Sequence, residues 1–157
     1  MTIDDLSVPI NHLNRETLLA DWNWLVDQKR LPVLVTKAGD AFVQDIESKA
    51  VFFVDVVEGQ LEQVAEDGNE FSECLKSVEF VMEKFSVNLI APFLKSGDNL
   101  PEGSLYGWKK LPFLGGEYSS SNLEHADVEV HFSIAGQVWS QVKDLPEGTQ
   151  IDEIRID

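Results

Sequence analysis

The chain has 157 residues, and its 28 acidic residues against 12 basic residues give a formal net charge of −16. This charge disfavours nucleic acid and anionic membranes as partners, because proteins bind both through Lys and Arg. Hydrophobic residues make up 43% of the chain, which is enough for a core, and the length is typical of one domain. We therefore expect a single folded domain, 1–157, and a partner that is basic rather than acidic.

The sequence indicates a cytoplasmic protein. No stretch reaches the roughly 18–20 apolar residues that span a bilayer. Asp4 and Asp5 stand where a signal peptide has a basic region. Cys74 is the only cysteine, which excludes an internal disulfide and a CxxC metal or redox pair.

The first predicted element is a helix over about residues 15–28. Asn14 is a favoured N-cap type, and proline at 32 disfavours helical backbone in the residue before it. Trp24 lies off the apolar stripe of this helix, about 200° from Trp22, and is therefore a candidate exposed aromatic. The stripe has spacings of three and four and consists of Leu18, Leu19, Trp22, Leu25 and Val26.

Residues 33–65 predict an antiparallel β-meander. The connections between the candidate strands are too short for parallel crossovers. One strand is continuously apolar, which is typical of a strand buried on both faces, and the last one alternates as if one face were solvated. The candidate strands cover residues 33–36, 41–44, 50–56 and 60–64.

Helical spacing returns over about 69–95, where Asn69 can serve as the cap. The segment 97–123 is rich in glycine and turn residues. Residues 126–143 fit two patterns: 126–135 alternate as in a strand, whereas steps of four and three over the whole segment fit a helix, which the length favours. The tail, 149–157, is compatible with an edge strand. The predicted fold class is α+β, with the meander packed against an N-terminal helix and two or three later helices.

The sequence contains no recognisable catalytic motif. Asp127, Glu129 and His131 would share one face of a strand and, with His125, form a metal site. On a helix, alternate residues point about 200° apart and do not converge. The favoured helix therefore argues against this metal site. Because no catalytic motif is present either, we expect no catalytic residue, metal or cofactor. A metal-dependent or hydrolytic enzyme that uses these four residues is the alternative.

Negative charge is concentrated between residues 40 and 83, a segment with twelve acidic residues and only two basic residues, Lys49 and Lys76. Such a surface either keeps the protein soluble or steers and holds a basic protein. Exposed aromatic side chains favour the second reading, because they are enriched at interface hot spots. The candidate partner-binding residues are Asp40, Asp45, Glu47, Glu58, Glu62, Glu66, Asp67, Trp24 and Tyr118.

Four motifs follow one another in the second half of the chain. They are Leu105-Tyr106-Gly107-Trp108-Lys109, Leu114-Gly115-Gly116-Glu117-Tyr118, Asn122-Leu123 and Val130-His131-Phe132-Ser133-Ile134-Ala135-Gly136-Gln137. In these motifs the chain resembles the C-terminal domain family of type VI secretion DNase-immunity proteins, formerly catalogued as a domain of unknown function. The resemblance extends over about residues 30–150.

The resemblance implies a small cytosolic α+β protein that binds and neutralises a toxin without catalysis of its own. We therefore predict a non-enzymatic immunity-type protein that blocks a basic, nuclease-like toxin through an acidic surface. An adaptor without any toxin is a further alternative. The resemblance also implies structural roles for Tyr106, Gly107, Trp108, Gly115, Gly116, His131 and Gln137.

Overall fold

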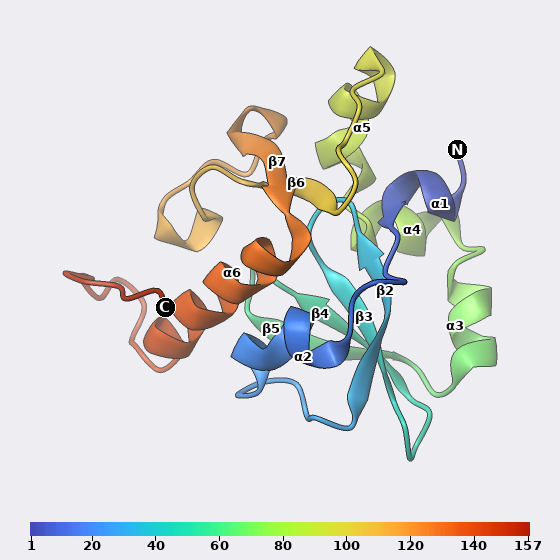
Figure 1. Cartoon of the computed structure of the whole chain (residues 1–157), viewed down its shortest axis with the longest axis horizontal. Helices are drawn as coiled ribbons and strands as arrows, with labels where there is room; N and C mark the ends of the chain where they lie inside the picture. Colours follow the sequence, from blue (N-terminus) through green and yellow to red (C-terminus); the bar gives the residue numbers. More distant parts are fainter.

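A five-stranded antiparallel sheet forms the centre of the computed structural model, which describes residues 1–157 (Figure 1). The strand order follows the chain, so the predicted meander is confirmed, and β1 extends it at the edge beside β2. The strands are β1 (Ser7–Val8), β2 (Arg30–Thr36), β3 (Ala41–Asp45), β4 (Val51–Asp55) and β5 (Gln60–Ala65).

A second sheet and a set of helices complete the α+β fold that the sequence predicts. The second sheet pairs β6 (Ser104–Trp108) with β7 (Leu123–Asp127). No helix is both long and apolar enough to cross a bilayer. The α-helices are α1 (Ile3–Leu6), α2 (Arg15–Leu19), α3 (Gly68–Cys74), α4 (Val78–Lys84), α5 (Val87–Ser96) and α6 (Val128–Val142), and the 3₁₀ helices are η1 (Ala20–Trp22), η2 (Pro112–Leu114) and η3 (Ser120–Asn122).

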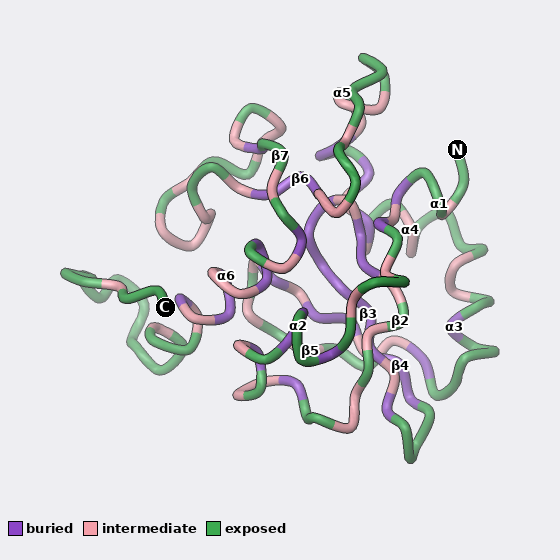
Figure 2. Tube along the Cα trace, in the orientation of Figure 1, coloured by how far each residue is buried: buried purple, intermediate pink, exposed green.

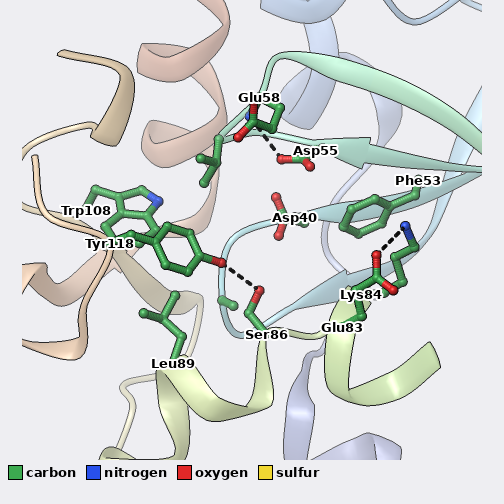
Figure 3. Close-up of a pocket in the computed structure, with 12 residues that line it drawn as sticks. Asp40, Phe53, Asp55, Glu58, Glu83, Lys84, Ser86, Leu89, Trp108 and Tyr118 are labelled. Atoms are coloured by element: carbon green, nitrogen blue, oxygen red, sulfur yellow. Dashed lines mark hydrogen bonds and ion pairs between the residues drawn. The ribbon is translucent and has the colours of Figure 1, made fainter. Parts of the chain in front are cut away.

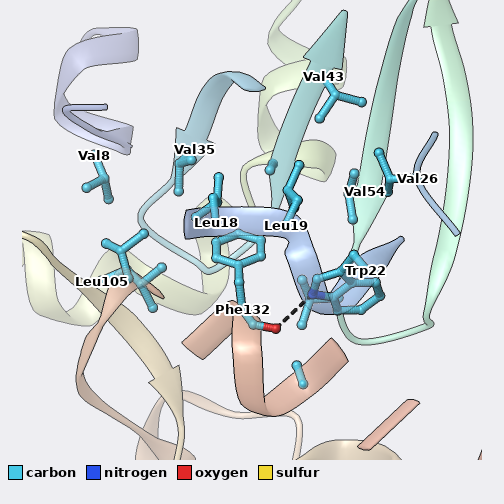
Figure 4. Close-up of a cluster of buried hydrophobic side chains, with 14 residues drawn as sticks. Val8, Leu18, Leu19, Trp22, Val26, Val35, Val43, Val54, Leu105 and Phe132 are labelled. Carbon is cyan, nitrogen blue, oxygen red and sulfur yellow. Dashed lines mark hydrogen bonds between the residues drawn. The ribbon is translucent and has the colours of Figure 1, made fainter. Parts of the chain in front are cut away.

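Both faces of the meander are covered, because successive residues of a strand point to opposite sides. Val43 and Val54 join the core under α2, η1 and α6, which Figure 4 shows around Trp22 and Phe132. Phe42 and Phe53 join a second core with side chains of α3, α4 and α5. Figure 2 shows the central strands as the most continuously buried part of the chain. The prediction that residues 50–56 are buried on both faces is confirmed.

Strand β6 connects the two cores. Leu105 belongs to the first core and Tyr106 to the second. The Tyr106 N–H also donates to the Lys37 carbonyl at 2.8 Å, which ties β6 to the turn between β2 and β3. This contact holds Trp108, at the end of β6, beside the end of the main sheet.

The predicted helix over 15–28 is wrong beyond residue 22. Asn14 caps α2 as expected, but the chain leaves the α-helix after Leu19. Trp22 donates its indole N–H to the Phe132 carbonyl at 2.8 Å, and Trp24 donates to the Gly136 carbonyl at 3.3 Å. A continuous helix would turn the two indoles about 200° apart, so both could not reach α6.

The predicted helix over 69–95 is three helices. Asp67, rather than Asn69, caps α3 by accepting from the Glu70 N–H at 2.9 Å. Ser77 caps α4 in the same way, through the Phe80 N–H. Ser86, between α4 and α5, has a left-handed backbone with φ of 48°, which no continuous helix contains. The two serines therefore break a stripe that reads as continuous in the sequence.

Residues 126–143 contain the predicted helix, but β7 ends immediately before it. The change occurs at Asp127, whose carboxylate accepts from the Val130 N–H at 3.0 Å and caps α6. The strands β6 and β7 were not predicted. The edge strand expected over 149–157 is wrong, because the backbone N–H groups of Arg155 and Asp157 donate to the side chains of Gln141 and Gln137 on α6.

Candidate functional site

A pocket of about 240 Å³ opens at one end of the main sheet. Three separate parts of the chain form it: the loops that follow β2 and β4, the junction of α4 and α5, and the region of β6 and the loop after it (Figure 3). The residues that line the pocket are Ala38, Asp40, Phe53, Asp55, Val57, Glu58, Glu83, Lys84, Ser86, Leu89, Trp108 and Tyr118.

Carboxylates dominate the polar lining, with four acidic side chains against one basic side chain, Lys84. The Lys84 ammonium already pairs with Glu62 at 2.5 Å and lies 3.6 Å from Glu83. It makes no ion pair with Asp40 or Asp55. The pocket is therefore strongly negative, which favours a cationic ligand over an anionic or neutral one.

Asp40 is the most deeply placed of these carboxylates, with 6% of its surface exposed. Its Oδ1 atom accepts from the Val56 N–H at 2.9 Å. Burial raises the pKa of the Asp40 carboxyl well above its usual range, and the charge of Asp55 raises it further, although the Val56 N–H and Lys84 act in the opposite direction. Thr36 fixes the loop, because its hydroxyl accepts from the Asp40 N–H at 3.0 Å.

Aromatic side chains form another wall. The rings of Trp108 and Tyr118 lie 5.3 Å apart, and Tyr118 is 60% exposed at the mouth of the pocket. The Tyr118 hydroxyl lies 3.5 Å from the Ser86 hydroxyl, which links this wall to the junction of α4 and α5. Phe53 of β4 contributes a buried ring on the opposite side. An acidic pocket with exposed aromatic faces can bind a cation through charge and stacking together.

The structure brings three of the expected partner-binding residues together in this pocket: Asp40, Glu58 and Tyr118. Glu62 lies beside it, paired with Lys84. Glu47, Glu66 and Asp67 are exposed elsewhere, and Asp67 caps α3.

Three of the expected partner-binding residues are not exposed: Asp40, Asp45 and Trp24. Asp45 is 3% exposed, and it accepts from the Glu47 and Ser48 N–H groups at 2.9 and 3.0 Å. These bonds, with Arg30 and Lys29, lower the pKa of Asp45 despite its burial and stabilise the turn after β3. Trp24 is half-buried and stacks on Trp22, so it forms part of the contact with α6.

Sequence reasoning missed Asp55, Glu83, Ser86 and Phe53 as residues of one site. Asp55 and Glu83 were visible only as members of the acidic segment. No short-range pattern shows that the end of a strand and the end of a helix, 28 positions further along, face the same pocket.

The motif residues of the second half make specific contacts within the fold. The Tyr106 hydroxyl donates to Asp98 at 2.7 Å, and Gln137 contacts Ser133 and the backbone of Asp157. Trp108 lines the pocket. Gly107, in β6, leaves no room for a side chain, because a Cβ there would lie 2.9 Å from that of Ala126.

The two glycines after η2 serve different purposes. Gly115 has φ of 97°, a conformation that glycine adopts without steric cost. Any Cβ at Gly116 would clash with the Lys110 carbonyl. The turn is thereby held against the start of the loop that carries Tyr118.

The four residues of the predicted alternative metal site do not form a cluster. His125 contacts Asp98 at 2.7 Å, Asp127 caps α6, and His131 is buried with its Nε2 atom 2.8 Å from the Gly39 carbonyl oxygen. Burial lowers the pKa of His131. No group of three or more His, Cys, Asp and Glu side chains is placed to hold a metal ion. The alternative prediction of a metal centre built from these residues is therefore wrong.

Residues 65–138 match the family described as T6SS immunity protein Tdi1, C-terminal. This match confirms the resemblance for slightly less than half of the chain and suggests an immunity-type function. The matched segment supplies α4, α5, β6 and the loop with Tyr118, and therefore one half of the pocket. No curated protein matches the chain.

A solved structure described as Atu4351 from Agrobacterium tumefaciens is similar to the chain at 15% sequence identity, with a TM-score of 0.49. The alignment covers 78% of this chain and 60% of that one, so this chain spans less than two thirds of that protein.

Proposed function

We propose that this chain is an immunity-type protein that binds a protein toxin and neutralises it, using the face around the acidic pocket. The main support for this proposal is the pocket, where four carboxylates and an exposed tyrosine converge. Half of its lining residues come from the segment that matches an immunity-protein family. We further propose that the chain acts in the cytoplasm.

The chemistry of the pocket favours a basic toxin of the nuclease type. A nuclease binds phosphates through Lys and Arg, and an acidic protein can cover the same basic surface. The net charge of −16 would speed the encounter of the two proteins.

We propose that neutralisation is by binding alone. The pocket presents carboxylates, aromatic rings and the hydroxyls of Ser86 and Tyr118, and no histidine lies among its lining residues to activate either hydroxyl. Carboxylates and rings in this arrangement are suited to hold a positively charged surface.

The test is co-expression with a candidate toxin, namely the product of a gene adjacent to the gene for this chain. The wild-type chain should restore growth, and the double variant Glu58→Gln/Glu83→Gln should restore it far less, because two pocket charges are lost. Glu79→Gln is a matched control, since Glu79 lies on α4, is exposed and does not line the pocket. Failure of the wild-type chain to protect cells or to form a complex with the toxin would overturn the proposal.

A further inference from the structure

Asp40 has a hydrogen-bonding capacity that the protein itself does not fill. Asp40 is only 6% exposed, and its side chain makes a single hydrogen bond, which Oδ1 accepts from the Val56 N–H. The Oδ2 atom accepts no hydrogen bond from any protein group. Figure 3 shows the carboxyl group facing the pocket between Asp55 and Ser86. Buried carboxylates are normally paired, and Oδ2 is open to the pocket, so a cationic donor of a ligand can reach it.

The one cation in the pocket does not fill that position. Lys84 pairs with Glu62, and its Nζ atom lies 5.1 Å from the centre of the Phe53 ring. This geometry directs the ammonium toward the rim, where Glu62 and Glu83 are exposed. Asp40 and Asp55 therefore face the pocket without a counter-ion.

The size and walls of the pocket select among cations. Its volume of about 240 Å³ is below the roughly 300–1,000 Å³ typical of sites for drug-sized ligands, so it fits a side chain better than a cofactor. A guanidinium group is planar, offers five N–H donors and stacks on aromatic faces, whereas an ammonium group is a compact, strongly hydrated charge. The carboxylates, with the rings of Trp108 and Tyr118, match the guanidinium group.

We propose that the pocket is a receptor for one arginine side chain of the partner, whose guanidinium group donates to Asp40 and Asp55 and stacks on Tyr118. This inference rests on the proposed function for the identity of the partner, but the pocket's preference for guanidinium over ammonium is a property of this chain alone. Binding of the cation would favour the ionised form of Asp40, so the affinity should fall as the pH is lowered through the Asp40 pKa.

The first experiment uses the intact chain and two small probes, N-acetyl-arginine amide and N-acetyl-lysine amide. NMR titration should show saturable shifts of the Trp108 indole N–H and the Tyr118 ring with the arginine probe, and at least about tenfold weaker binding of the lysine probe. Asp40→Asn and Tyr118→Ala should each weaken arginine binding several-fold, while Glu79→Gln should leave it unchanged. Equal binding of both probes, or arginine binding that survives Asp40→Asn in a folded protein, would overturn the inference.

The second experiment separates this inference from the proposed function. It measures the affinity of wild-type chain, Asp40→Asn and Asp55→Asn for the toxin. A toxin that binds all three equally leaves the immunity function standing and refutes the arginine receptor. Arginine binding that depends on Asp40, together with a wild-type chain that protects against no toxin, supports the receptor and refutes the proposed function. An NMR spectrum of each variant establishes that it is folded.

Discussion

Asp40 illustrates, at the scale of one residue, how a buried carboxyl group in a candidate site can lower stability. Its pKa is raised in the folded protein because burial and the Asp55 charge disfavour the ionised form. A group whose pKa is raised by folding stabilises the protein fully only below its unfolded pKa, and this contribution is lost as the pH rises through the folded pKa. Above the unfolded pKa the folded site therefore disfavours the ionised form that the unfolded chain adopts, which lowers the stability of the fold at neutral pH.

We expect Asp40→Asn to be more stable than the wild-type chain at pH 7. The amide oxygen can still accept from the Val56 N–H, while the carboxyl group whose ionisation burial opposes is gone, so the gain should be about 1 kcal/mol. Urea unfolding at pH 7 and near pH 4 measures it, and the difference should shrink at the lower pH. Equal stabilities at pH 7 would contradict the prediction. A variant that is more stable and yet binds the partner less well would identify a residue retained for function.

At the scale of elements, the contact between η1 and α6 depends on Gly136, a residue type that lowers the intrinsic stability of a helix. Glycine costs about 1 kcal/mol in a helix interior. In the structure Gly136 allows close approach, because a Cβ there would lie 2.7 Å from the Asp21 carbonyl oxygen and 2.9 Å from the Trp22 ring. The two tryptophans can then donate to carbonyls of α6.

We expect Gly136→Ala to destabilise the protein by about 1–3 kcal/mol, although alanine is the better helix former. The added methyl group must push η1 away from α6 and lengthen the hydrogen bond from Trp22. The free energy of unfolding in urea and the near-UV circular dichroism of the tryptophans measure the effect. Ser140→Ala, an exposed position of the same helix, is the control and should change stability by less than about 0.5 kcal/mol. Wild-type stability for Gly136→Ala would show that the contact relaxes freely.

At the scale of the whole molecule, the acidic segment is not one uniform face. Asp45 stabilises the turn after β3, Asp67 caps α3, and Glu62 pairs with Lys84. Asp40, Asp55 and Glu58 line the pocket without an ion pair. Only part of the charge can therefore make short-range contacts with a partner. The rest contributes to the long-range field, which salt screens over about 10 Å at 0.1 M.

We expect salt to affect the formation of the complex with the toxin more than its dissociation. Raising the salt from low to about 0.5 M should lower the association rate constant about tenfold or more, because it screens the field that steers the encounter. The dissociation rate constant should change much less, because contacts inside the pocket are shielded from ions. Stopped-flow fluorescence or surface plasmon resonance measures both rates. An association rate that is insensitive to salt would contradict the steering role of the charge.

The sequence predicted those elements whose signals are local. The short connections and apolar runs of residues 33–65 identified the meander, and steps of three and four identified α6. The strands β6 and β7 lie among glycines and turn residues, so their pairing is a tertiary contact without a local pattern. Likewise, the sequence around Trp22 and Trp24 is compatible with a continuous helix. Only the contact with α6, whose carbonyls accept from both indoles, requires another backbone path.

By itself, the sequence determined the net charge of −16 and, through its apolar patterning, the α+β fold, because both depend on composition and short spacings. Only the tertiary structure decided which carboxylates act together. Asp40 and Asp55 lie together because β3 pairs with β4 with Ala41 opposite Val54, and α4 brings Glu83 to the same pocket. Burial in that pocket changes the ionisation of Asp40, and burial is a property of the packed chain, not of any segment of it.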